Sequence, residues 1–316
     1  MKTRIVFFGT PEFATATLDA LRKAQGMEVV AIVTAPDKPA GRGLTLKASH
    51  IAENAGGIPL FKPTRLKDPL FLDLLQKLQA DVFVVVAFRM LPTEVWSMPT
   101  LGTFNVHASL LPHYRGAAPI QWALANGESV TGVTTFLLNE RIDEGQILLQ
   151  QELNIAENEA MGTLYSRLME AGALLAVATV KGLKSGNIVI KTQKTDSSAR
   201  LAPKIYPQFG QLELLITLDE IHHRIRACDP FPGASVCLQS TPKERIKLFN
   251  SEYISYCISS DYTIYVKLII SDNEVHLVQG KGVLKIHDIQ WPGKRKMKTS
   301  EFLRGFRLRG EFALDR

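Results

Sequence analysis

The sequence IVFFGTPE at residues 5–12 sets the fold class of the N-terminal part of the chain. It joins a short apolar run, which ends at Gly9, to Thr10 and Pro11, a pair typical of a helix N-cap followed by proline at the first helical position. We therefore expect a buried strand over residues 5–9 and a helix that continues to about residue 25. A strand followed at once by a helix is the repeating unit of α/β folds.

The same pattern continues along the first 190 residues. Apolar runs at residues 29–33 and 81–87 lack the alternation of a half-exposed strand, and an amphipathic helical segment at residues 66–79 lies between them. Such runs, separated by helices, indicate a mostly parallel sheet that is covered on both faces. Residues 103–107 and 131–138 extend this predicted sheet, and residues 160–183 form a predicted long helix. We therefore predict a doubly wound α/β domain over residues 1–190.

The composition changes after residue 190. Residues 191–198 are polar, and Pro203 and Pro207 interrupt the next stretch of chain, so residues 191–207 are predicted to be a linker. A helical segment at residues 218–227 is followed by short strand-like runs at residues 235–238, 246–249, 262–270, 275–278 and 283–289. Short strands separated by turns favour a small antiparallel β-barrel, so we expect an OB-like second domain over residues 208–316.

The positive charge lies in this second part of the chain. Lys and Arg balance Asp and Glu at 17 each over residues 1–190, whereas residues 191–316 carry 20 basic and 14 acidic residues, which accounts for the net charge of +6. Between Lys294 and Arg309 seven basic residues face one acid, Glu301. Such a cluster favours contact with the phosphates of a polyanion, and the alternative is an ordinary solvated surface.

Bulk features exclude several classes of protein. Apolar residues at 46% and charged residues at 22% are typical of a folded globular chain and exclude a disordered one. The three cysteines are widely spaced and form no Cys-x-x-Cys pair, which argues against a disulfide framework or a structural zinc site. The first apolar run is too short for a signal peptide or a membrane span, so we expect a cytoplasmic protein.

The sequence GTFNVHASLLP at residues 102–112 carries the candidate chemistry. The two-residue period of a strand puts Asn105 and His107 on the same side. Because the run ends at Pro112, the pair is predicted to lie at the carboxyl end of its strand, where ligands bind in open parallel sheets. An amide and an imidazole can both donate hydrogen bonds to a tetrahedral oxyanion.

An acid from the next predicted strand is expected to complete this set. Residues 131–138 lead into a glycine-containing loop in which Asp143 is the preferred partner of His107, although spacing alone leaves Glu140 and Glu144 open. A carboxylate there would hold the tautomer of His107 and favour its protonated form. The alternative is a structural Asn and His that close the end of the sheet.

Other enzyme classes fit less well. The turn at residues 8–11 lacks the second and third glycines of a dinucleotide-binding turn. Ser109 could join the same histidine and acid as in a serine hydrolase, but no Gly-x-Ser-x-Gly elbow presents its hydroxyl. His222 and His223 are adjacent on a predicted helix, and no His-Glu-x-x-His pattern occurs, so we expect no metal site.

Residues 102–112, followed by YRGAAPIQW at residues 114–122, resemble the folate-dependent formyltransferases. Within that family the resemblance is to the members that act on methionyl-tRNA, and it covers nearly the whole chain. The further matching segments are FGTPEFA at residues 8–14, PDKPAGRG at residues 36–43, GKRKM at residues 293–297 and FLRG at residues 302–305. The resemblance implies a Rossmann-like catalytic domain followed by a tRNA-binding domain.

The resemblance also implies a reaction. The α-amino group of initiator methionyl-tRNA would directly attack the formyl group of 10-formyltetrahydrofolate, giving N-formylmethionyl-tRNA for translation initiation. Asn105 and His107 would stabilise the oxyanion, and Asp143 would tune His107 and help a water move the proton. A single site for so large an acceptor makes a monomer the default expectation.

The residues implied for the two substrates form two sets. Those for the folate are Phe88, Arg89, Met90, Leu91, Ser109, Leu110, Leu111 and Pro112. Those for the tRNA are Lys38, Arg42, Lys294, Arg295 and Lys296, the last three from the basic run. The segment at residues 88–92 departs from the family by being one residue shorter, and residues 206–210 depart from its acid-rich pattern.

Related activities would use the same three catalytic residues. A formyltransferase for glycinamide ribonucleotide or an amino sugar would differ in its acceptor, and a formyltetrahydrofolate hydrolase would use water. The basic second domain and the loop around Arg42 favour a tRNA, because a small acceptor requires neither. A non-catalytic RNA-binding protein would need the basic barrel but not the set at Asn105, His107 and Asp143.

Overall fold

The computed structural model describes residues 1–40, 45–194, 198–212, 217–255 and 265–314. The chain divides into two compact units. The first comprises Met1–Gly116, Val130–Asn154 and Tyr165–Ala202, and the second comprises Ala117–Ser129, Ile155–Leu164 and Pro203–Arg316. The second unit thus includes helix α5 (Pro119–Ala125) from within the first 190 residues. The predicted domain limits at residues 190 and 207 stay predictions.

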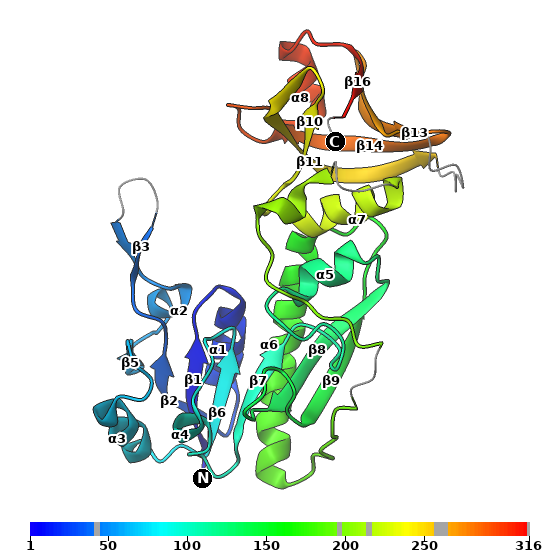
Figure 1. Cartoon of the computed structure of the whole chain (residues 1–316). Helices are drawn as coiled ribbons and strands as arrows, with labels where there is room; N and C mark the ends of the chain where they lie inside the picture. The colour runs from blue at the N-terminus through cyan, green and yellow to red at the C-terminus, as the bar shows by residue number, and fades with distance from the viewer. Residues whose placement is uncertain (41–44, 195–197, 213–216, 256–264, 315–316) are drawn as a thin grey trace. The chain divides into compact units, whose positions relative to one another are not determined.

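The first unit is built on a seven-stranded sheet with the order β5-β2-β1-β6-β7-β8-β9 (Figure 1). Its parallel strands are β1 (Thr3–Gly9), β2 (Met27–Val33), β5 (Leu60–Phe61), β6 (Val82–Val86) and β7 (Thr103–His107). Strand β8 (Val130–Leu137) runs antiparallel to β7, and β9 (Ile147–Asn154) runs antiparallel to β8. The mostly parallel sheet is therefore confirmed, while β5 and β9 have no counterpart among the predicted strands.

The central strands are buried on both faces, which is why they read as unbroken apolar runs. In β1, Val6 and Phe8 belong to one core cluster with Phe71 and Leu75 of helix α3 (Pro69–Lys77). Helix α1 (Phe13–Lys23) packs on β1, β2 and β6 through a different set of side chains. Each fully buried Phe or Val stabilises the fold by about 1.5–3 kcal/mol relative to an exposed side chain.

Helix α1 begins later than the sequence predicts. Its first residue is Phe13, and Glu12 occupies the N-cap position without a side-chain cap. The carbonyl of Pro11 accepts the Ala14 amide, and the carbonyl of Glu12 accepts the Thr15 amide and hydroxyl. The helix is therefore started by backbone acceptors after the proline, and the prediction of a cap at Thr10 was wrong.

Helix α6 (Met161–Ser185) confirms the predicted long helix and packs behind the strand that carries the candidate site. A Cβ atom on Gly172 of α6 would lie 3.0 Å from Cγ1 of Val106 in β7, so this glycine permits close packing. The short elements of this unit are β3 (Lys38–Ala40), β4 (Thr45–Lys47), α2 (His50–Glu53) and α4 (Thr93–Trp96). Within the described ranges, no helix has the length and apolar character needed to cross a bilayer.

The second unit contains an antiparallel sheet with the order β10-β11-β14-β13-β12-β16. The strands are β10 (Ala234–Leu238), β11 (Thr241–Ser255), β12 (Lys267–Ile270), β13 (Val275–Gln279), β14 (Gly282–Gln290) and β16 (Gly310–Ala313), with β15 (Met297–Lys298) paired to β14. A bridge between Leu238 and Leu314 joins the two edges of the sheet. The predicted small barrel is confirmed, although residues 262–264 of one predicted strand lie outside the described residues.

Besides α5, the second unit contains three helical elements among the described residues after residue 203. Helix α7 (Leu218–Cys228) follows η1 (Pro207–Gly210), and α8 (Thr299–Gly305) follows β15. A capping box starts α7, because Thr217 accepts the Glu220 amide while the Glu220 carboxylate accepts the Thr217 amide. The predicted helix at residues 218–227 is confirmed.

Candidate active site

Asn105 and His107 lie at the end of β7 on the face opposite to Val106, which packs against α6. Asn105 is only partly buried, and its amide makes no hydrogen bond to any of the residues that the structure describes. A partly exposed amide without a protein partner retains its hydrogen-bonding capacity for a ligand. The two-residue spacing thus brings the predicted pair together as expected.

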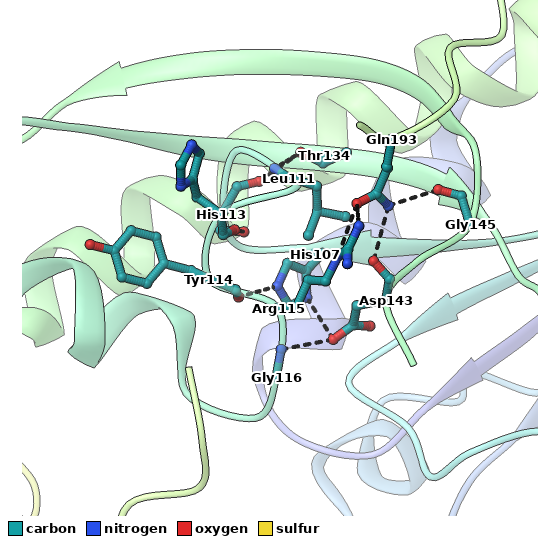
Figure 2. A network of polar contacts seen from close by, with 11 residues as sticks. His107, Leu111, His113, Tyr114, Arg115, Gly116, Thr134, Asp143, Gly145 and Gln193 are labelled. Carbon is teal, nitrogen blue, oxygen red and sulfur yellow. Dashed lines mark hydrogen bonds and ion pairs between the residues drawn. The ribbon is translucent and has the colours of Figure 1, made fainter. Parts of the chain in front are cut away.

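The imidazole of His107 is 6% exposed and is held from both ring edges. Its Nε2 atom lies 2.9 Å from the carbonyl oxygen of Tyr114, and its Nδ1 atom lies 3.9 Å from Oδ2 of Asp143 (Figure 2). A carbonyl oxygen can only accept, so Nε2 carries the proton of that hydrogen bond. The tautomer is therefore selected by the backbone of Tyr114, a role that the sequence had assigned to Asp143.

Asp143 reaches His107 by an unexpected route. Because β8 is antiparallel to β7, its last residue, Leu137, pairs with Phe104 near the start of β7. The loop after β8 therefore begins at the far end of the strand from His107 and folds back toward it. The structure thus places Asp143, the preferred candidate, beside His107, but through a loop that approaches from the opposite end of β7 because β8 is antiparallel.

The other two acids of the loop point elsewhere. Glu144 lies 3.4 Å from the guanidinium nitrogens of both Arg115 and Arg141, and Glu140 is exposed. The carboxylate of Asp143 is placed by the amide of Gly116, which donates to Oδ2 over 2.9 Å. Among the three acids that spacing left open, only Asp143 lies beside the imidazole.

Gly145 permits the tight return of this loop. A Cβ atom at this position would lie 1.5 Å from the carbonyl oxygen of Leu137, a separation that no side chain can adopt. Asp143 itself has a positive φ of 54°, which is uncommon for a residue with a side chain. The loop thus depends on a glycine and on outside contacts for its conformation.

Two of those contacts come from residues that sequence reasoning missed. Gln193 donates from Nε2 to the carbonyl oxygens of Asp143 (2.9 Å) and Gly145 (2.7 Å) (Figure 2). Arg115, which is 8% exposed, donates to Oε1 of Gln193 from Nε (3.1 Å) and Nη2 (2.6 Å). Both are polar residues in irregular segments and have no periodic signal; an arginine buried beside a candidate site could only be found in the structure.

The residues predicted to contact the folate divide by exposure. Three are enclosed by the protein: Leu91 in the core cluster under β6, Ser109, whose hydroxyl donates to the His113 carbonyl over 2.7 Å, and Leu111. The side chains of Phe88, Arg89, Met90, Leu110 and Pro112 keep some exposure. Arg89 donates to the carbonyls of Pro63 and Thr64, which braces this loop against a neighbouring segment.

Thr134 of β8 holds the loop that contains Ser109 and Leu111. Its hydroxyl donates to the Ser109 carbonyl over 2.7 Å and accepts from the Leu111 amide over 3.2 Å and from Nε2 of Gln150 over 3.0 Å. Thr134 is fully buried, so these bonds are shielded from water. The loop after β7 is therefore fixed to the sheet next to His107.

The residues predicted to contact tRNA lie in both units. Lys38 is exposed on the hairpin of β3 and β4, whereas Arg42 lies outside the described residues. Lys294 is exposed, and Arg295 pairs with Glu301 at 2.8 Å. The remaining one, Lys296, pairs with a nearly buried carboxylate of Asp229 at 2.8 Å and lies 4.1 Å from the ring centroid of Phe249.

His222 is a packing residue of the second unit. It is 2% exposed, and its Nδ1 atom lies 2.9 Å from the hydroxyl of Ser251 in β11. Burial, with Arg226 nearby, lowers the pKa of His222 to about 4. Among the described residues, no group of three His, Cys, Asp or Glu side chains is arranged to hold a metal ion.

Comparison with known proteins covers both units. The family model described as "Formyl transferase" matches residues 3–180, and the model described as "Formyl transferase, C-terminal domain" matches residues 204–307. The chain is 42% identical over 314 residues to the methionyl-tRNA formyltransferase of Flavobacterium psychrophilum, with 98% of each chain covered. It is also 42% identical over 316 residues to the methionyl-tRNA formyltransferase of Azobacteroides pseudotrichonymphae, with 96% of each covered.

Solved structures share the fold at low sequence identity. The N-formyltransferase from Helicobacter canadensis, in complex with folinic acid and dTDP-3-aminofucose, has a TM-score of 0.63 at 17% identity over 94% of this chain and 100% of that one. HypX from Aquifex aeolicus, in complex with tetrahydrofolic acid, has a TM-score of 0.61 at 16% identity. That match covers 100% of this chain, which spans only 51% of HypX.

Proposed function

Because this chain belongs to the family of methionyl-tRNA formyltransferases, we propose that Asn105, His107 and Asp143 carry the transfer of a formyl group from 10-formyltetrahydrofolate to the α-amino group of initiator methionyl-tRNA. The observation that supports this most directly is the state of the two hydrogen-bonding groups on β7. Asn105 has an amide without a partner among the described residues, and His107 turns Nδ1 toward Asp143 at 3.9 Å.

The reaction begins when the neutral amine of the methionyl group forms a bond to the formyl carbon. The electrons of the carbonyl double bond move to its oxygen, and a tetrahedral oxyanion results. Asn105 donates to this oxygen from its side-chain amide, and His107 donates from Nδ1. Because Nε2 is committed to the Tyr114 carbonyl, only Nδ1 can serve, and the ring must carry both protons to do so.

Asp143 acts on the charge of the imidazole and on the proton of the amine. At 3.9 Å its carboxylate is too far from Nδ1 for a direct hydrogen bond, yet close enough to stabilise the positive ring. This separation leaves the Nδ1 proton available to the oxyanion. The carboxylate accepts the proton of the attacking amine through a water. As the electrons of the oxyanion re-form the carbonyl double bond, the bond from carbon to N10 breaks, and N10 of the folate receives that same proton back from Asp143 through the water.

The loops at residues 87–92 and 109–112 suit a folate beside these groups. Strand β6 ends at Val86 next to Val106 of β7, so the segment after β6 starts close to the catalytic strand. Phe88, Met90, Leu110 and Pro112 offer partly exposed apolar surface for a ring system. The donor is a co-substrate, and no metal is assigned to the reaction.

The acceptor is supported by the charge of the chain. Lys38 on the β3–β4 hairpin and Lys294 in the second unit are exposed basic residues suited to phosphate contact. Arg42 is also predicted to contact the tRNA. Arg295 and Lys296 are paired with Glu301 and Asp229, so they would contact phosphates after these acids are displaced. An acceptor as small as an amino sugar would not require a basic barrel.

The test is formyl transfer from 10-formyltetrahydrofolate to methionyl-tRNA, with uncharged tRNA and free methionine as acceptor controls. We expect Asn105→Ala, His107→Ala and Asp143→Asn each to lower kcat by about 10²–10³, the effect of removing one oxyanion donor or its support. His113→Ala is a matched control, because this exposed histidine belongs to the same loop and points away from His107 (Figure 2). Folate consumed without formyl-methionyl-tRNA would instead show a hydrolase.

A further inference from the structure

The loop that carries Asp143 adopts a conformation that its own residues do not favour. It leaves β8 beside Phe104 and folds back to His107, and Asp143 takes a positive φ of 54°. For a residue with a side chain this conformation is sparsely populated and persists when the surroundings impose it. Something outside the loop must therefore hold the carboxylate near the imidazole.

Gln193 supplies that hold through a single side-chain amide. Both of its N–H groups are used, one on the carbonyl of Asp143 at 2.9 Å and one on the carbonyl of Gly145 at 2.7 Å. These two carbonyls lie on either side of Glu144, so the amide spans the turn that projects Asp143. Fixing the carbonyl of Asp143 fixes its ψ and thereby the direction of the following chain.

Arg115 fixes the orientation of this amide. Its Nε and Nη2 atoms donate to Oε1 of Gln193 at 3.1 and 2.6 Å, and its Nη1 atom lies 3.4 Å from Glu144. A guanidinium has only donors, so the oxygen of Gln193 must face it and the nitrogen must face the loop. The orientation is settled by the partners on both sides.

The residues that flank Arg115 touch the catalytic groups directly. Tyr114 accepts from Nε2 of His107 with its carbonyl, and Gly116 donates to Oδ2 of Asp143 with its amide (Figure 2). Three consecutive residues thus contact the histidine, the glutamine and the acid in turn. A shift of Gln193 would therefore reach Asp143 from two sides, through the carbonyls of its own loop and through the backbone around Arg115, where the Gly116 amide donates to its carboxylate.

We propose that Gln193, in the polar segment after α6, is a positioning residue that holds Asp143 against His107 by binding the carbonyls of Asp143 and Gly145 under the control of Arg115. The inference rests on the proposed function, because it assigns Gln193 a part in the same reaction. Gln193 does not contact the reacting atoms in this scheme. Its effect on turnover passes through Asp143.

Gln193→Glu is the most informative substitution. Glutamate keeps the size of glutamine and still offers oxygen to Arg115, but it has no N–H for the two carbonyls and brings a negative charge toward them. We expect kcat to fall about tenfold or more while KM for both substrates stays within about twofold. Lys194→Gln, at the next and exposed position, is the matched control and should retain wild-type kcat.

A double-mutant cycle separates positioning from general structural support. If Gln193 acts through Asp143, then Gln193→Glu lowers kcat in the wild-type chain but causes no further loss in the Asp143→Ala chain. If it only supports the fold, the two losses multiply and the unfolding midpoint falls in both backgrounds. Gln193→Ala removes the amide without adding a charge. The same cycle is measured with this variant, which replaces Gln193→Glu if the glutamate variant does not fold.

The side-chain ¹⁵N signals of His107 give a second readout. The Gln193→Glu chain should show changed Nδ1 and Nε2 shifts for His107 and unchanged shifts for His50, an exposed histidine on α2. Unchanged His107 signals with normal kcat would overturn the inference about Gln193 alone. Normal kcat in the Asp143→Asn and His107→Ala variants would instead overturn the proposed function.

Discussion

Nε2 of His107 donates to the carbonyl oxygen of Tyr114 over 2.9 Å, and Tyr114 itself has a positive φ of 62°. A main-chain acceptor therefore sets the tautomer of the candidate catalytic histidine, and it does so from a backbone conformation that side chains disfavour. The cost of that conformation, about 1–2 kcal/mol for an L-residue, is offset elsewhere in the segment. One offsetting contact is the Tyr114 amide, which donates to the carbonyl of Arg200 over 2.5 Å.

This relationship predicts that two substitutions of Tyr114 lower kcat to different extents. Both Tyr114→Asn and Tyr114→Val remove the buried ring, but asparagine accepts positive φ whereas the β-branched valine does not. We expect the asparagine variant to keep about tenfold more kcat than the valine variant, measured with saturating substrates. Equal kcat in the two variants would mean that the carbonyl of residue 114 does not set the histidine.

Thr134→Val tests the support of the loop that precedes Pro112. The substitution keeps the shape of the buried side chain but leaves the Leu111 amide and the Ser109 carbonyl without their hydroxyl partner. An unsatisfied buried group costs about 1–3 kcal/mol, so the loop should shift and KM for the folate should rise about tenfold. Thr134→Ser, which keeps the hydroxyl, is the matched control and should retain the wild-type KM.

The candidate pair on β7 could be predicted from the sequence for a simple physical reason. Asn105 and His107 are two residues apart on a strand, and the period of a strand is fixed by its geometry. The apolar runs likewise predicted the sheet, because β1 and β6 are buried on both faces. Local repetition is therefore the property that made these features predictable.

The contacts that hold the site do not depend on repetition. Gln193 is 50 residues from Asp143 in the chain and binds main-chain carbonyls, which every residue possesses. The direction of β8 was missed for a similar reason, since an apolar run does not record whether it pairs in parallel or antiparallel. Asp143 lies beside His107 although its loop approaches from the other end of the strand.

The residues of the basic run in the second unit are expected to differ in their effects on tRNA binding and on stability. Lys294→Gln and Arg295→Gln should each reduce the slope of log affinity for tRNA against log salt by about 0.7–0.9, the value for one phosphate contact. The measurement is binding of methionyl-tRNA over a range of salt concentrations. An unchanged slope in both variants would show that this surface is only solvated.

Lys296→Gln should act differently from its neighbours. It removes the ion pair with Asp229, which is mostly buried, and the cation–π contact with the ring of Phe249. We expect a loss of about 1–3 kcal/mol in the free energy of unfolding from the carboxylate left without its cation, accompanied by weaker tRNA binding. Unchanged stability together with a flatter salt slope would identify Lys296 as a phosphate contact alone.

Protonation of His222 should destabilise the second unit in mild acid. The folded-state pKa of His222 is lowered to about 4 by burial and by Arg226, whereas an unfolded histidine titrates near its ordinary value of about 6.5. As pH falls below that value, the unfolded chain takes up a proton that the folded chain does not, so stability is complete above about pH 6.5 and declines toward pH 4. At about 1.4 kcal/mol for each pH unit, the loss is at most about 3.5 kcal/mol.

His222→Asn removes this titration but keeps a group that can bond to the hydroxyl of Ser251. Its stability at about pH 7 should be lower than that of the wild-type chain, because a buried ring is lost, yet it should fall less between about pH 7 and pH 5. Denaturant unfolding of both chains across that range gives the two slopes, and His50→Gln on α2 controls for an exposed histidine. Parallel slopes for the wild-type and His222→Asn chains would show that the proton enters elsewhere. A buried histidine next to Arg226 is the physical reason to expect them to diverge.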